Sequence, residues 1–269
     1  MQRAARFFVG SDALDRSVRL DAPPERIVSL VPSQTELLAY LDLADQVVGI
    51  TRFCERPEDW REQKPIVGGT KQVKVDAVRD LDPDLILANH EENTPEDVEA
   101  LADVAPVYVT DVATVPDAIA MIRTVGRLTN RSDAAQALAD DIETAFNDLG
   151  DFSAVRSAYL IWRDPFMTVG HDTIIHDIMA RGGFENVFGD RTRYPEVSLD
   201  ELAAVDPDVL LLPDEPFPFP TKEKFSADLR EALSDAKIEF VDGQLFSWYG
   251  PRLLDTPSYL TELRSDLSA

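Results

Sequence analysis

The sequence VDAVRDLDPDLIL at residues 75–87 is matched position by position by LDELAAVDPDVLL at residues 199–211. Each copy has the pattern of a short amphipathic helix, a turn containing proline, and an apolar run of β-strand length. The aligned acidic residues are Asp76 with Asp200, Asp82 with Asp206, and Asp84 with Asp208. Because one αβ unit occurs twice, the sequence predicts two similar lobes that each present an acid at an equivalent place.

The composition is that of a folded and strongly acidic protein. The 269 residues allow one large domain or two of ordinary size, and 44% of them are hydrophobic, which is enough for a buried core. The formal net charge of -24 argues against nucleic acid or an anionic membrane as a partner, because both would be repelled. The acids either keep the surface solvated or, in part, meet a basic partner.

Cysteine usage and the start of the chain say little about the compartment. Cys54 is the only cysteine, so no intramolecular disulfide forms, and we expect it to pack as a small apolar side chain. No run approaches the ~18 apolar residues of a membrane-spanning helix. The opening stretch MQRAARFFVGSDALD has no apolar core like that of a signal peptide, so no export signal is expected.

Strand and helix patterns alternate along the first half of the chain. Residues 1–25 are polar and predict an extended lead-in. Ser33 and Glu36 have the spacing of a capping box, and Thr94 followed by Pro95 suits the start of another helix. Strands are expected at 26–32, 46–50, 66–70, 85–88 and 106–110. This alternation is typical of the α/β class with a parallel sheet.

Residues 116–150 show no strand pattern and are predicted to form two helices, interrupted at 129–131. A linker of this kind would act as a stiff strut. Strands then recur at 155–162, 165–170, 209–212 and 238–243, with helices at 172–183 and 251–267 and a second capping box at Ser198 and Glu201. We therefore divide the chain into an N-terminal α/β lobe (1–115), a helical linker (116–150) and a C-terminal α/β lobe (151–269).

The three histidines form no recognisable catalytic motif. His90-Glu91-Glu92 resembles the start of a zincin motif but lacks a second histidine four positions on, and His171 and His176 fall well apart around a helix. The chain contains no nucleophile elbow, Walker loop or dinucleotide-binding fingerprint. We assign no catalytic or metal-ligating residue, and a metal-assisted enzyme that uses His90, Glu91, Glu92 and His171 stays as an alternative.

Aromatic residues gather at predicted strand ends and in loops. In open α/β sheets, ligands bind beyond the carboxyl ends of the strands, where ring faces suit a flat, partly apolar ligand. About half of these rings are expected to pack the lobes' own cores instead. Arg52, Arg163 and Arg252 lie beside aromatic residues and either grip an anionic or carbonyl-bearing ligand group or pair with neighbouring carboxylates. The aromatic residues are Phe53, Trp60, Trp162, Phe166, Tyr194, Phe217, Phe219, Trp248 and Tyr249.

Asp76 and Asp200 fall in the first turn of their predicted helices. An acid there stabilises a helix by ~0.3–1 kcal/mol through the helix dipole, so either residue taken singly has a structural explanation. The matched placement of the two acids favours a role that both lobes share.

Taken together, these segments resemble the substrate-binding proteins of metal-chelate ABC importers. This is the helical-backbone group that includes the cobalamin-binding and siderophore-binding proteins. The resemblance covers nearly the whole chain, and the order and spacing of the segments carry it. The segments are RIVSLVPSQTELL, VVGITRFC, VGGTK, LDPDLILANHEEN, GHDTIIHDIMARGG, RYPEVSLDEL and LFSWYGPRLL.

The resemblance implies a class III periplasmic-binding-protein fold, with two Rossmann-like α/β lobes joined by a long inter-lobe helix. It also implies a monomeric, non-catalytic protein with no covalent cofactor, which holds a corrinoid or a ferric chelate (siderophore or haem-like) between the lobes. Family acids that dock into arginine pockets of the membrane permease match Asp76 and Asp200, with aspartate replacing glutamate. The implied ligand contacts are Phe53, Trp162, Phe166, Tyr194 and Trp248, with Arg52, Arg163 and Arg252 orienting the ligand.

The chain departs from the family pattern in three respects. Thr70 stands where cobalamin binders carry a tryptophan after the third strand, which weakens cobalamin as the ligand. The loop NHEEN is like that of an uncharacterised subgroup. The family is periplasmic or extracytoplasmic, whereas the missing export signal leaves a cytoplasmic location open, with an intracellular chelate carrier or sensor as the alternative function.

Overall fold

Each copy of the repeated sequence forms the helix and strand expected of it. In the computed structural model, which describes residues 6–221 and 226–268, α3 (Val75–Asp80) precedes β7 (Leu85–Asn89). In the same way, α8 (Leu199–Val205) precedes β13 (Val209–Pro213). All five residues of each strand are buried, as expected for strands of a parallel sheet that is covered on both faces.

The chain divides into two units. Unit 1 contains the described residues up to Val112, together with Pro116–Glu143 and Tyr249–Pro251. Unit 2 contains Ala113–Val115, Thr144–Trp248 and the described residues from Arg252 onward.

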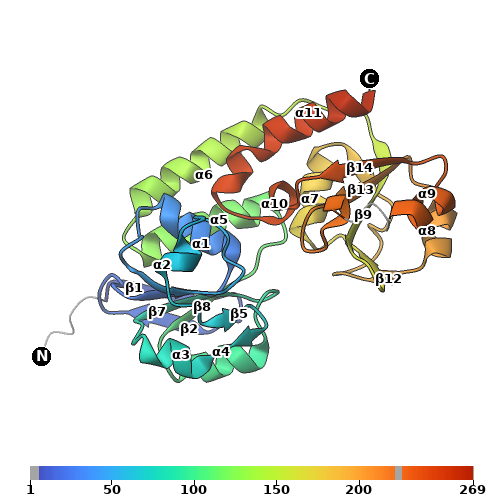
Figure 1. Ribbon diagram of the computed structural model, residues 1–269. Coiled ribbons are helices and arrows are strands. Elements are labelled where there is room, and N and C mark those ends of the chain that lie inside the picture. The colour runs from blue at the N-terminus through green and yellow to red at the C-terminus, as the bar shows by residue number, and fades with distance from the viewer. Residues whose placement is uncertain (1–5, 222–225, 269) are drawn as a thin grey trace, which may run out of the picture. The chain divides into compact units, whose positions relative to one another are not determined.

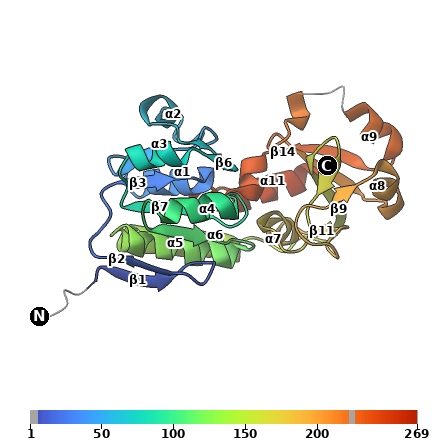
Figure 2. The same ribbon diagram turned by 90° about the horizontal axis from the view of Figure 1, so that it is seen from below.

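Unit 1 is built on a sheet of four parallel strands. The elements of the first half, besides α3 and β7, are β1 (Phe8–Ser11), β2 (Ser17–Leu20), β3 (Ile27–Ser29), α1 (Pro32–Tyr40), β4 (Val47–Ile50), α2 (Trp60–Gln63), β5 (Gly68–Gly69), β6 (Gln72–Val73), α4 (Pro95–Ala102), β8 (Val107–Thr110), α5 (Val115–Leu128) and α6 (Ser132–Asn147). The strand order is β4-β3-β7-β8. Figure 1 shows α1 and α5 on one face of this sheet and α3 and α4 on the other. Seen from below in Figure 2, α3 and α4 lie side by side.

Unit 2 repeats this arrangement. Its further elements are β9 (Val155–Trp162), β10 (Phe166–Thr168), α7 (Ile174–Arg181), β11 (Phe184–Asn186), β12 (Glu196–Val197), η1 (Phe219–Thr221), α9 (Ser226–Ala232), β14 (Lys237–Val241), α10 (Gly243–Ser247), η3 (Pro251–Leu254) and α11 (Thr256–Ser268). The parallel strands follow the order β11-β9-β13-β14, while β10 pairs antiparallel with β9 and β12 pairs antiparallel with β10. Since β11, β9, β13 and β14 correspond in order to β4, β3, β7 and β8, the predicted duplication is confirmed.

Alternate residues of the strands in unit 2 serve opposite faces of its sheet. Ala158 and Leu160 belong to a core cluster with Leu210 and Leu212, which also includes Leu202 of α8. Tyr159, between the first two, instead contacts the ring of Phe246 on α10, with ring centroids 5.3 Å apart. α8 and α9 therefore cover one face, and α10 covers the other.

The two aspartates of each Asp-Pro-Asp segment have different structural roles. Asp82 and Asp206 adopt left-handed backbone conformations, with φ of 44° and 46°, just beyond the ends of α3 and α8. Aspartate visits this region more readily than most residues, so it suits the end of a helix that turns into a strand. The matching dihedral angles explain why an aspartate recurs at this position.

The second aspartate ties its strand to the neighbouring strand. The carboxylate of Asp84 accepts hydrogen bonds from the backbone N–H groups of Glu25 (2.8 Å) and Arg26 (3.0 Å). The Arg26 guanidinium in turn donates to the carbonyl oxygens of Leu81 and Asp82 at the end of α3. This reciprocal pair forms a clamp that fixes α3 and β7 against the start of β3.

Unit 2 contains the equivalent clamp with fewer bonds. Asp208 accepts one hydrogen bond from the backbone N–H of Arg156 (3.1 Å), and the Arg156 guanidinium donates to the carbonyl of Val205 (2.5 Å). The repeat thus preserves a structural pair as well as the exposed acids at Asp76 and Asp200.

The prediction of an extended lead-in at residues 1–25 is wrong for its described part. Residues 8–20 form the antiparallel hairpin β1–β2. The buried Asp12 holds this hairpin together: its carboxylate accepts hydrogen bonds from Arg16 and from the backbone N–H of Val109. That long-range contact with β8 leaves no local pattern in the sequence.

One of the two predicted capping boxes forms. Ser198 and Glu201 bond reciprocally at the start of α8, which confirms that box. The box at Ser33 and Glu36 is wrong, because α1 begins one residue earlier at Pro32 with Val31 as its cap. A proline fits the first helical position since its missing N–H has no helical partner there, and this places Ser33 inside the helix. Thr94 caps α4 as predicted.

The helices predicted in residues 116–150 are α5 and α6. They lie side by side, with the Arg123 guanidinium contacting Asp140 (2.9 Å) and Glu143 (3.4 Å). Cys54 is buried beside the hydroxyls of Thr35 and Thr51, which agrees with its predicted packing role. Across residues 6–221 and 226–268, no helix has the length and apolar character needed to cross a membrane.

Candidate functional site

The carboxyl edge of the sheet in unit 2 carries a group of aromatic rings. Trp162 is the last residue of β9, and 41% of it is exposed. Its ring and the ring of Phe217 meet edge to face with centroids 5.7 Å apart, and Phe217 contacts Phe219 at 4.6 Å. Phe217 and Phe219 are buried and belong to the core cluster, so they support the exposed Trp162 from behind.

Arg163, Phe166 and Tyr194 lie in the same unit. The Arg163 guanidinium lies over the Phe166 ring, 5.1 Å from its centroid, and 3.7 Å from the carboxylate of Asp164. Phe166 begins β10 and is half-buried, as is Tyr194 in the segment before β12. Arg163 therefore stacks on a ring and pairs with a neighbouring carboxylate, the second of the two alternatives predicted for it.

Trp248 is held more tightly than the other predicted contacts. It is only 7% exposed, and its indole N–H donates to Glu215 Oε1 at 2.8 Å. Gln244 donates to the other oxygen of the same carboxylate at 3.3 Å. The Arg252 guanidinium lies 5.9 Å from the centroid of the Trp248 ring. The Glu215 carboxylate thus fixes the orientation of this indole, a role that the sequence alone did not indicate.

The carboxyl edge of unit 1 presents an exposed phenylalanine ring. Phe53, just beyond β4, is 47% exposed, and the Arg52 guanidinium lies 4.8 Å from its centroid. Both side chains pack on the backbone of Gly69, where a Cβ atom would come within 3.1 Å of each of them. A side chain at this position would therefore require the arginine and the phenylalanine ring to shift slightly.

Two buried asparagines shape the loop after β7. The Asn89 side chain accepts hydrogen bonds from the backbone N–H groups of Glu91 (2.9 Å) and Glu92 (3.1 Å). Asn93 accepts from the N–H of Asn89 (2.9 Å) and donates to the carbonyl of Thr70 (2.8 Å). Sequence reasoning missed both residues, although two asparagines four positions apart after a strand are a usable signal of such a loop.

The side chains on this loop are acidic. Burial, and then the charge of Glu91, raise the pKa of the Glu92 carboxyl group, while Lys71 and Thr70 act in the opposite direction. His90 Nδ1 lies 3.6 Å from Asp111 Oδ2 at the end of β8. Burial raises the pKa of the Tyr249 phenol well above its ordinary value, and the charge of Glu92 adds to this effect.

The structure places Asp76 and Asp200 in the first turns of α3 and α8. The Asp76 side chain is 94% exposed and pairs with Arg79 one turn along. Asp200 is also exposed, next to the capping residue Glu201. The two acids occupy equivalent positions in the two units.

The histidines have structural partners. His171 Nδ1 lies 2.8 Å from the carbonyl oxygen of Arg191, and His176 Nδ1 lies 3.2 Å from Asn186. Burial, followed by the charge of His171, lowers the pKa of His176. Among the described residues, no group of three or more His, Cys, Asp and Glu side chains is arranged to hold a metal ion.

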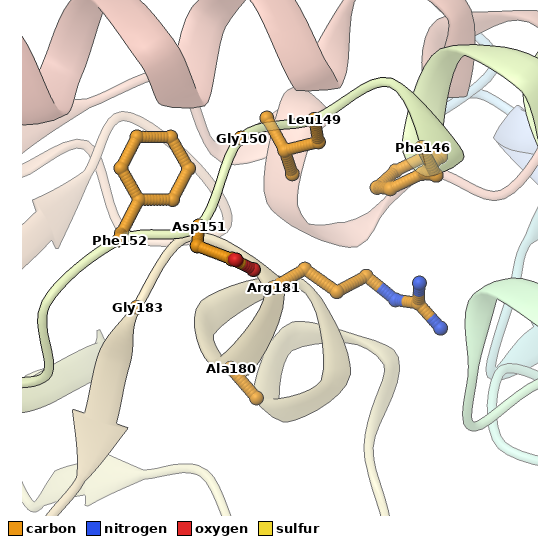
Figure 3. A pocket seen from close by; sticks show the side chains of 8 residues that line it. All are labelled: Phe146, Leu149, Gly150, Asp151, Phe152, Ala180, Arg181 and Gly183. Carbon is orange, nitrogen blue, oxygen red and sulfur yellow. The ribbon is translucent and has the colours of Figure 1, made fainter.

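Two hollows among the described residues lie at the opposite, amino edges of the sheets. Figure 3 shows one of about 280 Å³ in unit 2, where Arg181 on α7 extends toward Phe146 and Gly183 precedes β11. The Arg181 guanidinium already pairs with Asp177 and lies over the Phe146 ring. A hollow of about 260 Å³ in unit 1 is bordered by Ala22–Glu25 ahead of β3. Because ligands of open α/β sheets bind at the carboxyl ends of strands, neither hollow is the candidate site.

Residues 27–233 match the family model of periplasmic binding proteins. The chain belongs to this family. Its fold is shared by the periplasmic vitamin B12 binding protein of Vibrio cholerae, with a TM-score of 0.78 at 19% identity over 91% of this chain and 98% of that one. Two parallel-sheet units with the strand order described above are therefore the framework of a periplasmic binding protein.

Curated relatives of this periplasmic binding protein are distant in sequence. An uncharacterized ABC transporter substrate-binding lipoprotein of Bacillus subtilis is 24% identical over 264 residues, covering 93% of this chain and 83% of that protein. A cobalamin-binding protein of Halobacterium salinarum is 28% identical over 209 residues. That match covers 74% of this chain and 57% of the Halobacterium protein, so the chain spans little more than half of that relative.

Proposed function

We propose that this protein binds a metal chelate, either a corrinoid or a ferric chelate such as a siderophore or haem. It delivers the chelate to the permease of an ABC importer and catalyses no reaction. The observation that carries the proposal is the exposed ring with an adjoining arginine at each carboxyl edge, namely Phe53 with Arg52 and Trp162 with Arg163. Such rings suit the flat face of a large chelate, and guanidinium groups suit its polar periphery.

The remaining predicted contacts complete this proposed surface in unit 2. Phe166 and Tyr194 offer partly exposed rings, whereas Trp248 forms a rigid wall with Arg252 over it. The names of relatives support the ligand class, since they include a vitamin B12 binding protein and a cobalamin-binding protein. We further propose that the protein acts as a monomer with one ligand.

Equilibrium titration tests the proposed ligand class. We expect the purified protein to bind cyanocobalamin or a ferric hydroxamate with a dissociation constant in the micromolar range or below, a free energy of about -8 kcal/mol or better. Quenching of tryptophan fluorescence follows the binding, because Trp162 is exposed. Dissociation constants above millimolar for corrinoids, ferric siderophores and haem alike would refute the proposal.

Charge reversal tests the proposed contact with a permease. Asp76→Lys and Asp200→Lys, singly and together, are expected to abolish chelate uptake by cells while the affinity for the chelate stays within about twofold. An exposed acid facing a basic pocket gives an attraction that a lysine turns into repulsion. Uptake is measured with a labelled chelate in cells that also express the cognate transporter.

Two other exposed acids provide matched controls for this experiment. Asp80 lies on α3 with Asp76, and Asp235 lies in unit 2 ahead of β14. The control variants are Asp80→Lys and Asp235→Lys. Both variants change the net charge equally and should leave uptake intact. Loss of chelate affinity in the Asp76 or Asp200 variants would place those acids in the ligand site instead.

A further inference from the structure

The loop after β7 and the end of β8 bring three carboxyl groups to the carboxyl edge of unit 1. We name Glu91, Glu92 and Asp111, with the phenol of Tyr249, the acidic rim. We propose that the acidic rim binds a carboxamide on the periphery of the chelate and selects against chelates that carry carboxylates there. This inference rests on the proposed function and adds the chemistry by which unit 1 selects its ligand.

The backbone under the acidic rim is fixed. Asn89 accepts hydrogen bonds from the N–H groups of both Glu91 and Glu92, and Lys71 Nζ donates to the carbonyl oxygen of Glu91 at 3.1 Å. A glutamate in a freely moving loop would turn into solvent at little cost. Here the backbone that carries the two adjacent carboxyl groups is held at the end of a strand, where open α/β sheets place ligands.

Tyr249 supplies an independent indication of a ligand group. It belongs to unit 1 and is only 6% exposed. Among the described residues, no partner completes a hydrogen bond of normal geometry with its hydroxyl, although Ser33 lies near it. Gly250 allows the close approach to α1, since a Cβ there would lie 3.0 Å from the Ser33 carbonyl. A buried hydroxyl held in this way is unfavourable unless a further group bonds to it.

The charges around Tyr249 indicate which group that is. The carboxylates of Glu92, Glu91 and Asp111 all act on its phenol and raise its pKa. Lys71 is the cation that acts on Glu92, and His90 lies beside Asp111. A ligand carboxylate brought here would add a further negative charge to a partly buried acidic group, which is unfavourable.

A carboxamide is complementary to the acidic rim. Its NH₂ group donates to a carboxylate of the rim, while its carbonyl oxygen accepts from the Tyr249 hydroxyl. The Arg52 guanidinium lies over the Phe53 ring.

A single chemical change in the ligand tests this selection. Cyanocobalamin carries peripheral carboxamides, and its monocarboxylic acid derivatives carry a carboxylate at one of those positions. We expect wild-type protein to bind cyanocobalamin at least about tenfold more tightly than one of the three common monoacids. Glu92→Gln should reduce that ratio to about threefold or less, and the Glu91→Gln, Glu92→Gln double variant should remove it.

Glu96→Gln is the matched control, because Glu96 is exposed in the first turn of α4, outside the acidic rim. It should leave the ratio at its wild-type value. Tyr249→Phe should weaken cyanocobalamin binding several-fold with no fall in the unfolding temperature. A fall in stability with unchanged affinity would overturn the role given to the phenol.

The outcomes separate this inference from the proposed function. Equal affinity of wild-type protein for cyanocobalamin and all its monoacids would overturn the carboxamide site and leave chelate binding intact. Tighter binding of haemin, which carries two propionates, than of cyanocobalamin would overturn it as well. Failure to bind corrinoids, haemin and ferric hydroxamates altogether would refute the proposed function itself.

Discussion

Asp84→Ala is expected to lower the free energy of unfolding of unit 1 by about 2–3 kcal/mol, because it removes a carboxylate that accepts two backbone hydrogen bonds. The loss also leaves Arg26 without the carboxylate that positions its backbone at the start of β3. Asp208→Ala should cost less, about 1–2 kcal/mol in unit 2, since only one such bond is present there. The specific prediction is that Asp84→Ala lowers the free energy of unfolding of unit 1 more than Asp208→Ala lowers that of unit 2.

Hydrogen exchange measured by mass spectrometry in increasing denaturant separates the two units, whose unfolding is not required to be two-state. Peptides from β3 and β7 report on Asp84→Ala, and peptides from β9 and β13 report on Asp208→Ala. Asp80→Ala is the control: Asp80 is an exposed acid at the end of α3, where a negative charge is unfavourable to the helix dipole. It should leave stability unchanged or slightly higher. Equal losses in both units would contradict the role of the second backbone bond.

Much of the fold could be predicted from the sequence because the signals for it are local. Hydrophobic periodicity, turns that contain proline and capping residues predicted the repeated helix and strand in both halves. The hairpin at residues 8–20 was missed because Asp12 is held by Val109, far along the chain. No window of sequence contains both partners, so a polar segment with a buried carboxylate is indistinguishable from an extended one.

Less of the candidate site could be predicted from the sequence, because contacts between residues far apart in the chain also position its side chains. Aromatic residues at strand ends were predicted from position, and Phe53 and Trp162 are indeed exposed there. Trp248 is buried instead, and a hydrogen bond to Glu215 from another loop orients it. The contribution of Asn89 likewise depends on backbone N–H groups whose directions are set only once the strand has ended.

That difference in burial determines which ring to remove in a binding experiment. Trp162→Ala is expected to raise the dissociation constant of the chelate by about 30-fold or more, equivalent to about 2 kcal/mol, as for a large aromatic anchor. Trp162 is 41% exposed, so part of its ring is available to a ligand. Trp248→Ala, by contrast, would destabilise unit 2, because that indole is buried and hydrogen-bonded.

Isothermal titration of each variant with cyanocobalamin or a ferric hydroxamate measures the effect, and thermal unfolding verifies that the variants are folded. Tyr40→Ala is the matched control: Tyr40 is 49% exposed, but it lies at the carboxyl end of α1, away from the strand ends. Its removal deletes a comparable exposed ring and should change affinity by less than about twofold. If Trp162→Ala binds as tightly as wild type, the exposed ring does not contact the ligand, and other groups of unit 2 hold it. Such a result would move the proposed contact to Phe166 and Tyr194, which the same titration tests directly.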